Sequence, residues 1–361
     1  MNQALGGWWG CRRDDDVTNL SPPAAIRRQS TERRQKLPIL PFQSSLSLSS
    51  TCRPATMATS SFSSLVLRLV TLNVRYATQR PGPNEKPWSV RCPRLCAQLK
   101  FIASGQDAPF LCLQEVLHSQ LNDTQDSLGS SWAYIGHGRQ DGKEAGEYSP
   151  IFYRQDLWEC ERHRTYWLSP TPDVPSKGWG AALERIVTVG LFRHRRTETA
   201  VVVMSTHFDH RGKVAREESA RLLVKLAQTW AEESEGGVII PVFLGGDFNC
   251  PPDERAYKIL TEPNSGMWDI SDHVADDAKY GNHKFTFTSF DDPEERPARI
   301  DFLFARATES LRFLTYSILS NRFDDGIFLS DHRPVVADVE VPIGLSCVLE
   351  GYCGGRSHGR E

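Results

Sequence analysis

The sequence has no excess of positive charge. Among its 361 residues, 42 lysines and arginines stand against 45 aspartates and glutamates, for a formal net charge of −3. Proteins that hold a long nucleic acid by its phosphates usually carry a strongly basic surface. The overall charge therefore gives no support to a nucleic-acid substrate, although a local basic groove on an acidic protein would still allow one.

The sequence also lacks two marks of exported and membrane proteins. It contains no run of about 18 apolar residues, so no transmembrane helix is predicted. Its nine cysteines are odd in number and scattered, and Cys112 and Cys250 lie in apolar or motif-dense segments. This distribution favours reduced thiols over a disulfide framework. We therefore expect an intracellular protein, in the cytoplasm or the nucleus.

Residues 1–62 differ in composition from the rest of the chain. They are rich in Ser, Thr, Pro and Arg and carry a net charge of +4, which leaves −7 for the remainder. A segment of this kind buries too little apolar surface to offset the entropy lost on ordering, so we predict disorder here and in the tail 343–361. Two interpretations of the N-terminal segment stay open. Residues 1–56 faintly resemble a mitochondrial presequence in their Arg and Ser content, although Asp14 to Asp16 argue against one. Alternatively, translation starts at Met57, shortly before the first predicted strand.

Residues 63–342 carry the pattern of one α/β domain. The clearest helix is predicted over residues 213–233, and another over residues 88–104. The apolar face of the first carries Leu222, Leu223, Leu226 and Trp230. Strands are predicted at 65–73, 110–114, 151–154, 165–168, 186–193, 200–206, 238–244, 300–305 and 335–341. No linker interrupts this series.

Five short polar motifs are predicted to lie at the carboxyl ends of apolar strands, where loops gather functional groups on one edge of a rigid sheet. The motifs occupy residues 72–76, 113–116, 205–210, 245–249 and 330–334, and residues 300–302 add an acid within a strand. They supply carboxylates, amides and histidines, but no nucleophilic cysteine and no Ser-His-Asp arrangement. This set suits phosphoester cleavage assisted by a hard cation.

Individual residues of these motifs match the needs of that reaction. Glu115 and the amide oxygen of Asn73 are suitable ligands for a hard cation. Asp247 can orient and deprotonate the attacking water, and Asn249 can hold that water or a phosphate oxygen.

Two histidines can act on the phosphate itself. His207 and His332 can donate hydrogen bonds to the pentacovalent phosphate. Asp301 can fix the tautomer and the charge of His332.

In their order, the motifs resemble those of the endonuclease/exonuclease/phosphatase superfamily. Asn, Gln-Glu, Thr-His, Gly-Asp-Phe-Asn, Ile-Asp and Ser-Asp-His follow one another from about residue 65 to residue 341. The resemblance implies a four-layer αββα sandwich of two mostly antiparallel sheets flanked by helices, with Mg²⁺ or Mn²⁺ bound at one edge. It implies metal binding by Asn73, Glu115 and Asp331, and catalysis by His207, Asp247, Asn249, Asp301 and His332.

A finer resemblance points to an uncharacterised subgroup near the deadenylase and nocturnin branch. It rests on residues 136–142 and 146–154, and it extends to Arg139, Trp179 and Arg185 as substrate-binding candidates. These three can also be buried structural residues. The resemblance implies a metal-dependent phosphoester hydrolase similar to 3′–5′ exoribonucleases.

Two alternatives stay open beside the exoribonuclease. The same chemistry can act on a small phosphate ester or a phospholipid head group, which the near-neutral charge favours slightly. A catalytically inactive binding module is a third interpretation, and it predicts the loss of at least one motif residue. Asn73, Glu115, Asp247, Asn249 and His332 are all retained, which argues against it. No protein partner is predicted.

Overall fold

A computed structural model describes residues 64–232, 239–306 and 310–343. Residues 1–62, and the tail apart from Ile343, lie outside the described residues, so their predicted disorder stays a prediction. None of the helices in the described ranges is long and apolar enough to cross a membrane.

Two sheets form the centre of the domain. The first sheet has the order β10 (Lys279–Tyr280), β12 (Arg312–Ile318), β13 (Val335–Pro342), β1 (Ser64–Asn73), β2 (Pro109–Gln114), β4 (Ile151–Arg154) and β3 (Trp132–Ile135). The second has the order β5 (Trp158–Trp167), β6 (Ile186–His194), β7 (Ala200–His207), β8 (Val242–Asp247), β11 (Asp301–Arg306) and β9 (Met267–Asp269). Within the described part of the chain, only the pairs β1–β2, β7–β8 and β10–β12 are parallel. The expected mostly antiparallel sheets are therefore confirmed.

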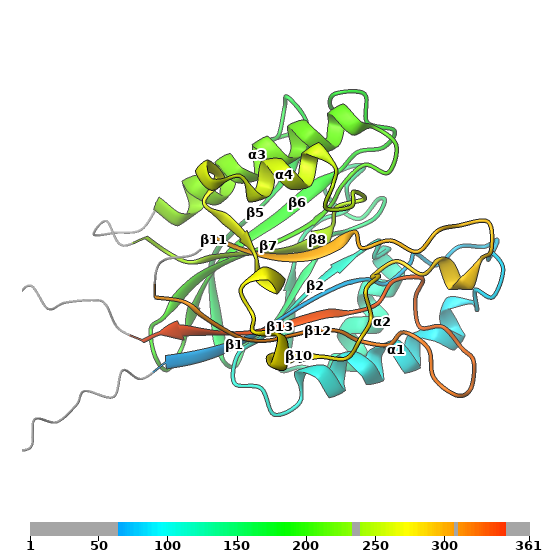
Figure 1. The fold of residues 1–361 in the computed structure, drawn as a ribbon, viewed down its shortest axis with the longest axis horizontal. Coiled ribbons are helices and arrows are strands. Elements are labelled where there is room, and N and C mark those ends of the chain that lie inside the picture. The colour runs from blue at the N-terminus through cyan, green and yellow to red at the C-terminus, as the bar shows by residue number, and fades with distance from the viewer. Residues whose placement is uncertain (1–63, 233–238, 307–309, 344–361) are drawn as a thin grey trace, which may run out of the picture. The chain divides into compact units, whose positions relative to one another are not determined.

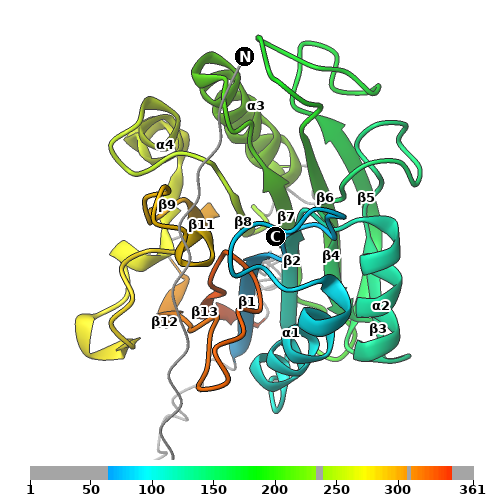
Figure 2. The ribbon, with the colours of Figure 1, turned by 90° about the vertical axis from the view of Figure 1, so that its right-hand side faces the viewer.

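Helices cover the outer face of each sheet (Figures 1 and 2). The first sheet is covered by α1 (Trp88–Ala103) and α2 (His118–Leu128), and the second by α3 (Lys213–Glu232) and α4 (Arg255–Thr261). Three buried apolar clusters fill the spaces between the resulting four layers. The predicted αββα sandwich is thus confirmed.

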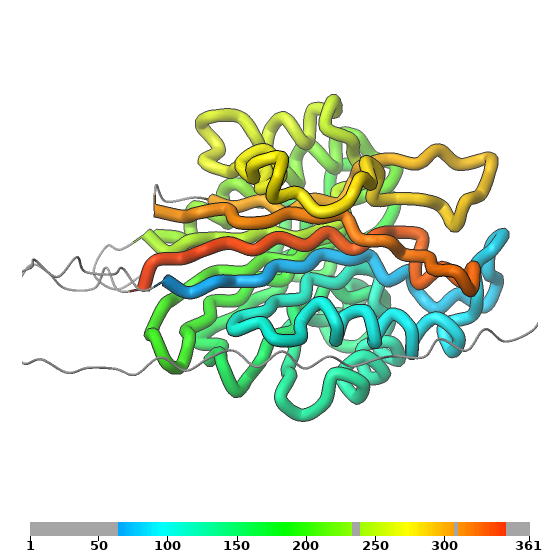
Figure 3. Tube along the Cα trace, turned by 60° about the horizontal axis from the view of Figure 1, so that its bottom comes forward, coloured from blue at the N-terminus to red at the C-terminus, as the bar shows by residue number. Residues whose placement is uncertain are grey.

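The alternation of apolar residues in β1 shows how the sequence builds these layers. Leu67 and Leu69 point into the cluster between the sheets, whereas Val70 and Leu72 belong to the cluster under α1 and α2. Successive side chains of a strand face opposite sides, so a strand that is apolar throughout fits a sheet covered on both faces. Figure 3 shows β1 lying beside β13, the antiparallel partner from the far end of the described chain.

Gly246 in β8 allows a close approach between β8 and β7. A Cβ atom at this position would lie 2.5 Å from the carbonyl oxygen of Thr206, which is its register partner in β7. We expect Gly246→Ala to lower the free energy of unfolding by about 1–3 kcal/mol, because backbone must shift to admit the methyl group. Thermal unfolding followed by circular dichroism measures this loss.

Gly82→Ala is the matched control for this substitution. A Cβ at Gly82 has its nearest neighbour 3.8 Å away, at Oε2 of Glu85. Its stability should stay within about 0.5 kcal/mol of the unsubstituted protein. Equal melting temperatures for the two variants would contradict the close approach at Gly246.

Candidate active site

The predicted site residues meet at one edge of the two sheets. The parallel pair β1–β2 sets Asn73 opposite Gln114, the residue before Glu115, and the parallel pair β7–β8 sets His207 opposite Asp247. Asp301 begins β11 and pairs with Asp247 in the antiparallel ladder. Pairing within each sheet thus brings together groups that lie far apart in the sequence.

The motif at residues 330–334 reaches this edge by a different route from the one predicted. It does not follow a strand, because β12 ends at Ile318 and the motif immediately precedes β13. Since β13 runs antiparallel to β1, the start of β13 lies at the carboxyl end of β1. The prediction that this motif ends a strand was wrong. The Ser330 hydroxyl ties the motif to β1 by donating to the Asn73 carbonyl at 2.6 Å.

Three residues of the site adopt left-handed backbone conformations. Arg75, Glu115 and Asn249, each one or two residues beyond a strand end, have φ angles of 60°, 60° and 48°. Such angles are costly for residues with a side chain and persist only where the surrounding structure imposes them. Asn249 shows one such constraint, because its backbone N–H donates to Oδ1 of Asp247 at 2.9 Å.

Asp247 lies at the centre of the site and is only 1% exposed. Its Oδ2 accepts a hydrogen bond from Nδ2 of Asn73 at 3.0 Å. The same oxygen lies 3.4 Å from Nε2 of His207 and 3.7 Å from Nε2 of His332. Burial, reinforced by the charge of Asp301, raises the pKa of Asp247 to about 7. A carboxylate with this pKa is suited to accept a proton at neutral pH.

His332 and Asp301 form a buried pair. Nδ1 of His332 lies 2.8 Å from Oδ2 of Asp301. Burial alone would lower the pKa of His332, but the carboxylates of Asp301 and Asp247 raise it to about 10. His332 therefore carries a positive charge at neutral pH and can donate a hydrogen bond through Nε2.

The tautomer of His207 follows from its contacts with Asn249. Nδ2 of Asn249 donates to the Phe208 carbonyl at 3.1 Å and lies 3.0 Å from Nε2 of His207. The ring nitrogen must accept in this contact. Burial, together with the charge of Arg185, lowers the pKa of His207 well below its usual value. Neutral His207 therefore carries its proton on Nδ1, the side that faces Glu147 at 3.8 Å. Its predicted donation to phosphate stays a prediction.

The carboxylates of Glu115 and Asp331 fit a divalent cation. Burial would raise the pKa of Glu115, but the hydrogen bond from Asn73 and the charge of Arg75 lower it. Burial, with the charge of Glu115 nearby, raises the pKa of Asp331 even though His332 opposes the shift. Paired carboxylate oxygens of this kind are the ligands that Mg²⁺ and Mn²⁺ prefer. A bound cation would neutralise charge on the phosphate.

Asn73 is oriented differently from a metal ligand. Its Oδ1 accepts from the backbone N–H of Arg75 at 2.9 Å, while Nδ2 donates to Glu115 and Asp247. Its predicted role as a ligand therefore stays a prediction. Asp247, Asp301 and His332 are a second buried group able to hold a metal, with ligand atoms within 4.8 Å of one another. The pair between His332 and Asp301 already uses two of those atoms.

Removing the charge of Glu115 tests the metal assignment. We expect Glu115→Gln to weaken Mn²⁺ binding by about 10–100-fold or more, because the substitution keeps the volume but removes an anionic ligand. Loss of a residue that only hydrogen-bonds to a metal ligand already costs about 10–100-fold in metal affinity. Isothermal titration calorimetry measures the affinity, and thermal unfolding checks that the variant folds. Unchanged Mn²⁺ affinity, or undiminished turnover of the unsubstituted protein in excess EDTA, would rule out this role.

A cleft of about 630 Å³ opens over these residues. Its charged lining consists of seven acids and two arginines, with no lysine: Glu85, Glu115, Glu147, Asp247, Asp292, Glu295 and Asp331 with Arg75 and Arg185. His207, His210 and His332 line it as well. The cleft is therefore predominantly acidic.

The three predicted substrate-binding residues occupy different positions. Arg185 lines the cleft and is buried. Arg139 lies behind it, paired with Glu147 at 2.8 Å. Trp179 is half-buried, with a φ angle of 53°, and is not part of the cleft lining. The structure thus brings Arg185, but not Trp179, to the reacting groups.

Sequence reasoning missed several residues of the cleft, above all Arg75, Glu85 and Glu147. Arg75 lies in the motif at residues 72–76, in which a role was predicted only for Asn73. Glu147 belonged to a recognised stretch without any assigned role. Glu85 lies in a segment without any motif, and its pairing with Arg75 at 3.1 Å appears only in the fold.

Comparison with known proteins agrees with this geometry. The sequence profile of the Endonuclease/Exonuclease/phosphatase family matches residues 70–332. An endonuclease/exonuclease/phosphatase from Bacteroides vulgatus is 34% identical, with a TM-score of 0.67 over 76% of this chain and 99% of that one. The Bacteroides thetaiotaomicron mannosyl-6-phosphatase Bt3783 is 31% identical, with a TM-score of 0.66 over 76% and 99% of the two chains.

The human nocturnin catalytic domain shares the fold at 16% identity, with a TM-score of 0.57 over 76% of this chain and 93% of that one. Comparison by sequence with curated proteins gives no match. The chain belongs to the endonuclease/exonuclease/phosphatase family, whose members hydrolyse phosphoesters.

Proposed function

We propose that this protein hydrolyses a phosphomonoester of a small molecule by means of an activated water and a divalent cation. The observation that carries the proposal is the acidic cleft, in which seven carboxylates stand against two arginines. The charge of one phosphate would be compensated by His332 and by a cation held by Glu115 and Asp331. Further phosphates along a strand would lie near the acids at the rim, such as Asp292 and Glu295, and be repelled.

The relatives support the same substrate class. A protein with 31% identity over 99% of its length is named as a mannosyl-6-phosphatase, which acts on a phosphomonoester. The nocturnin domain, at 16% identity, shares the fold alone. The exoribonuclease, predicted by resemblance, remains the rival hypothesis, and the phospholipid head group remains an alternative within the small-ester class.

The chain's own residues account for activation of the water and for the charge that grows on the phosphate. Asp247 removes a proton from the attacking water, and Asn249 beside it holds the water or a phosphate oxygen. His332, kept protonated by Asp301 and Asp247, donates to the phosphate as negative charge grows. Glu115 and Asp331 would hold the cation.

A substrate panel with Mn²⁺ tests this proposal against the exoribonuclease. We expect turnover of a hexose 6-phosphate to exceed that of oligo(A) and of sphingomyelin. Binding at a single phosphate should also depend weakly on salt, whereas a strand-tracking enzyme loses affinity with a logarithmic slope of roughly 0.7 per phosphate contacted. The measurement is kcat/KM for each substrate at several salt concentrations. A steep slope, with activity that grows with oligonucleotide length, would point instead to a polynucleotide channel.

A further inference from the structure

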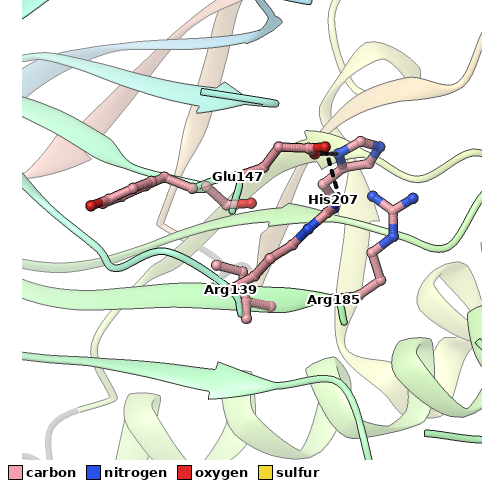
Figure 4. A pocket seen from close by; sticks show the side chains of 7 residues that line it. Arg139, Glu147, Arg185 and His207 are labelled. Carbon is pink, nitrogen blue, oxygen red and sulfur yellow. Dashed lines mark hydrogen bonds and ion pairs between the residues drawn. The ribbon is translucent and has the colours of Figure 1, made fainter. Parts of the chain in front are cut away.

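A second polar group lies beside the reacting centre and has no part in the proton and charge steps above. It consists of Arg139, Glu147, Arg185 and His210, and Figure 4 shows the first three around His207. The His207 ring connects it to the centre, with Nε2 3.4 Å from Asp247 and Nδ1 3.8 Å from Glu147. Only the imidazole ring of His207 thus separates the group from Asp247. The part of a bound ester beyond its phosphate can therefore reach the group.

Arg185 brings unused hydrogen-bond donors to this group. Its side chain is 4% exposed, and Nη2 is satisfied by Nδ1 of His210 at 3.0 Å. Nε and Nη1 are buried without a hydrogen-bond partner, and the nearest carboxylate to Nε, that of Asp209, is 3.7 Å away. Leaving buried charged donors unsatisfied is costly. Arg185 lines the cleft, so a bound molecule that displaces the side chains now covering Nε and Nη1 would supply the missing acceptors.

Glu147 brings an acceptor to the same place. Its Oε1 accepts from Nη2 of Arg139 at 2.8 Å. Its Oε2 lies beyond hydrogen-bond reach of His207, and the side chain lines the cleft. Nδ1 of His210 accepts from Arg185, so a neutral His210 carries its proton on Nε2. Burial, followed by the charge of Arg185, lowers the pKa of His210 and favours that neutral form.

Each arginine of the group faces a carboxyl group. Arg139 pairs with Glu147, whose pKa burial and the charge of Glu115 raise to about 7, and Arg185 faces Asp209. Burial would raise the pKa of Asp209, but hydrogen bonds from the backbone of Gly212 and Arg211 lower it and keep the carboxylate ionised. No cation of the group is left over for a second phosphate. A hydroxyl, which both donates and accepts, matches a set of side chains that offers donors and an acceptor side by side.

We propose that Arg185, Glu147 and His210 bind hydroxyl groups of the substrate body and so select phosphate esters of polyhydroxylated molecules, such as sugars. This inference rests on the proposed function, because it concerns the part of the substrate that leaves after hydrolysis. The contacts exist in the bound substrate as well as in the transition state, so they should act mainly on KM.

The test compares a hexose 6-phosphate with n-hexyl phosphate, an alkyl ester of the same carbon number without hydroxyls. We expect the unsubstituted protein to favour the hexose ester by about tenfold or more in kcat/KM. Glu147→Gln and Arg185→Lys should each reduce this ratio about tenfold, chiefly by raising KM for the hexose ester, because each substitution removes or misplaces a charged hydrogen-bond partner. Two matched controls should leave the ratio unchanged. Glu144→Gln changes a side chain that is 75% exposed in the same loop as Glu147. Arg164→Lys changes an arginine in an exposed ion pair.

Each outcome bears on a different claim. Hydrolysis of both esters at similar kcat/KM by the unsubstituted protein overturns the hydroxyl subsite but leaves the monoesterase standing, and this comparison does not depend on a variant that folds. An equal fall in kcat for both esters in Glu147→Gln means that Glu147 acts only through His207, which also overturns the subsite. Hydrolysis of neither ester, with turnover of oligo(A), removes the proposed function and the subsite together.

Discussion

Asp247→Asn should lower kcat by about 10²–10⁴ while KM changes only a few-fold. Asparagine keeps the shape of the side chain and an oxygen that can accept from the Asn249 backbone, but it cannot take a proton from water. Burial and the charge of Asp301 give Asp247 a pKa of about 7, the range in which a general base is most effective near neutral pH. Proton transfer belongs to the transition state, so the loss should appear in turnover.

The matched control for this substitution is Asp253→Asn. Asp253 is exposed, follows the same strand and does not line the cleft, so its kinetics should equal those of the unsubstituted protein. Steady-state kinetics on a hexose 6-phosphate and thermal unfolding of both variants complete the measurement. A folded Asp247→Asn protein with near-normal kcat would move the role of base to another residue.

The layers of the fold could be predicted because their sequence patterns are strong. β4 (Ile151–Arg154) matches its predicted range, and α3 (Lys213–Glu232) fills its predicted range as far as the described residues reach. Both are strongly apolar on the faces that they bury. The parts that were not predicted lack such a signal. Only the end of β5 (Trp158–Trp167) was predicted, at 165–168, because its first half is largely charged and exposed. In β12 (Arg312–Ile318), which was not predicted, only the last three residues are buried.

The candidate site likewise contains residues that the sequence predicted and contacts that it did not predict. Asp247, Asp301 and His332 were found because each stands in a short motif next to a strong strand, and the fold brings them together. The polar contacts of Glu147 and Arg185 depend on loops whose course no local pattern specifies. The burial of Arg185 without a full set of partners likewise arises only from tertiary packing.

His332→Ala should lower kcat by about 10²–10³, the usual loss when one donor to a transition-state anion is removed. The direct contact of Asp301 with a reacting group is the one of 2.8 Å with Nδ1 of His332, and its charge also helps to raise the pKa of Asp247. We therefore expect a smaller loss for Asp301→Asn. The double variant should fall within about a factor of two of His332→Ala alone, because an orienting carboxylate has nothing to orient once the imidazole is gone.

Stability gives a second, independent readout of the same pair. His332→Ala leaves the carboxylates of Asp301 and Asp247 facing each other without a cation in a fully buried setting, where loss of one partner typically costs about 3–5 kcal/mol. Adding Asp301→Asn removes one of those charges and should restore part of the melting temperature while leaving kcat low. Such a double variant, more stable than His332→Ala yet no more active, would show that Asp301 serves the charge and orientation of His332. If the loss of kcat in the double variant equalled the product of the two single losses, the two side chains would act independently.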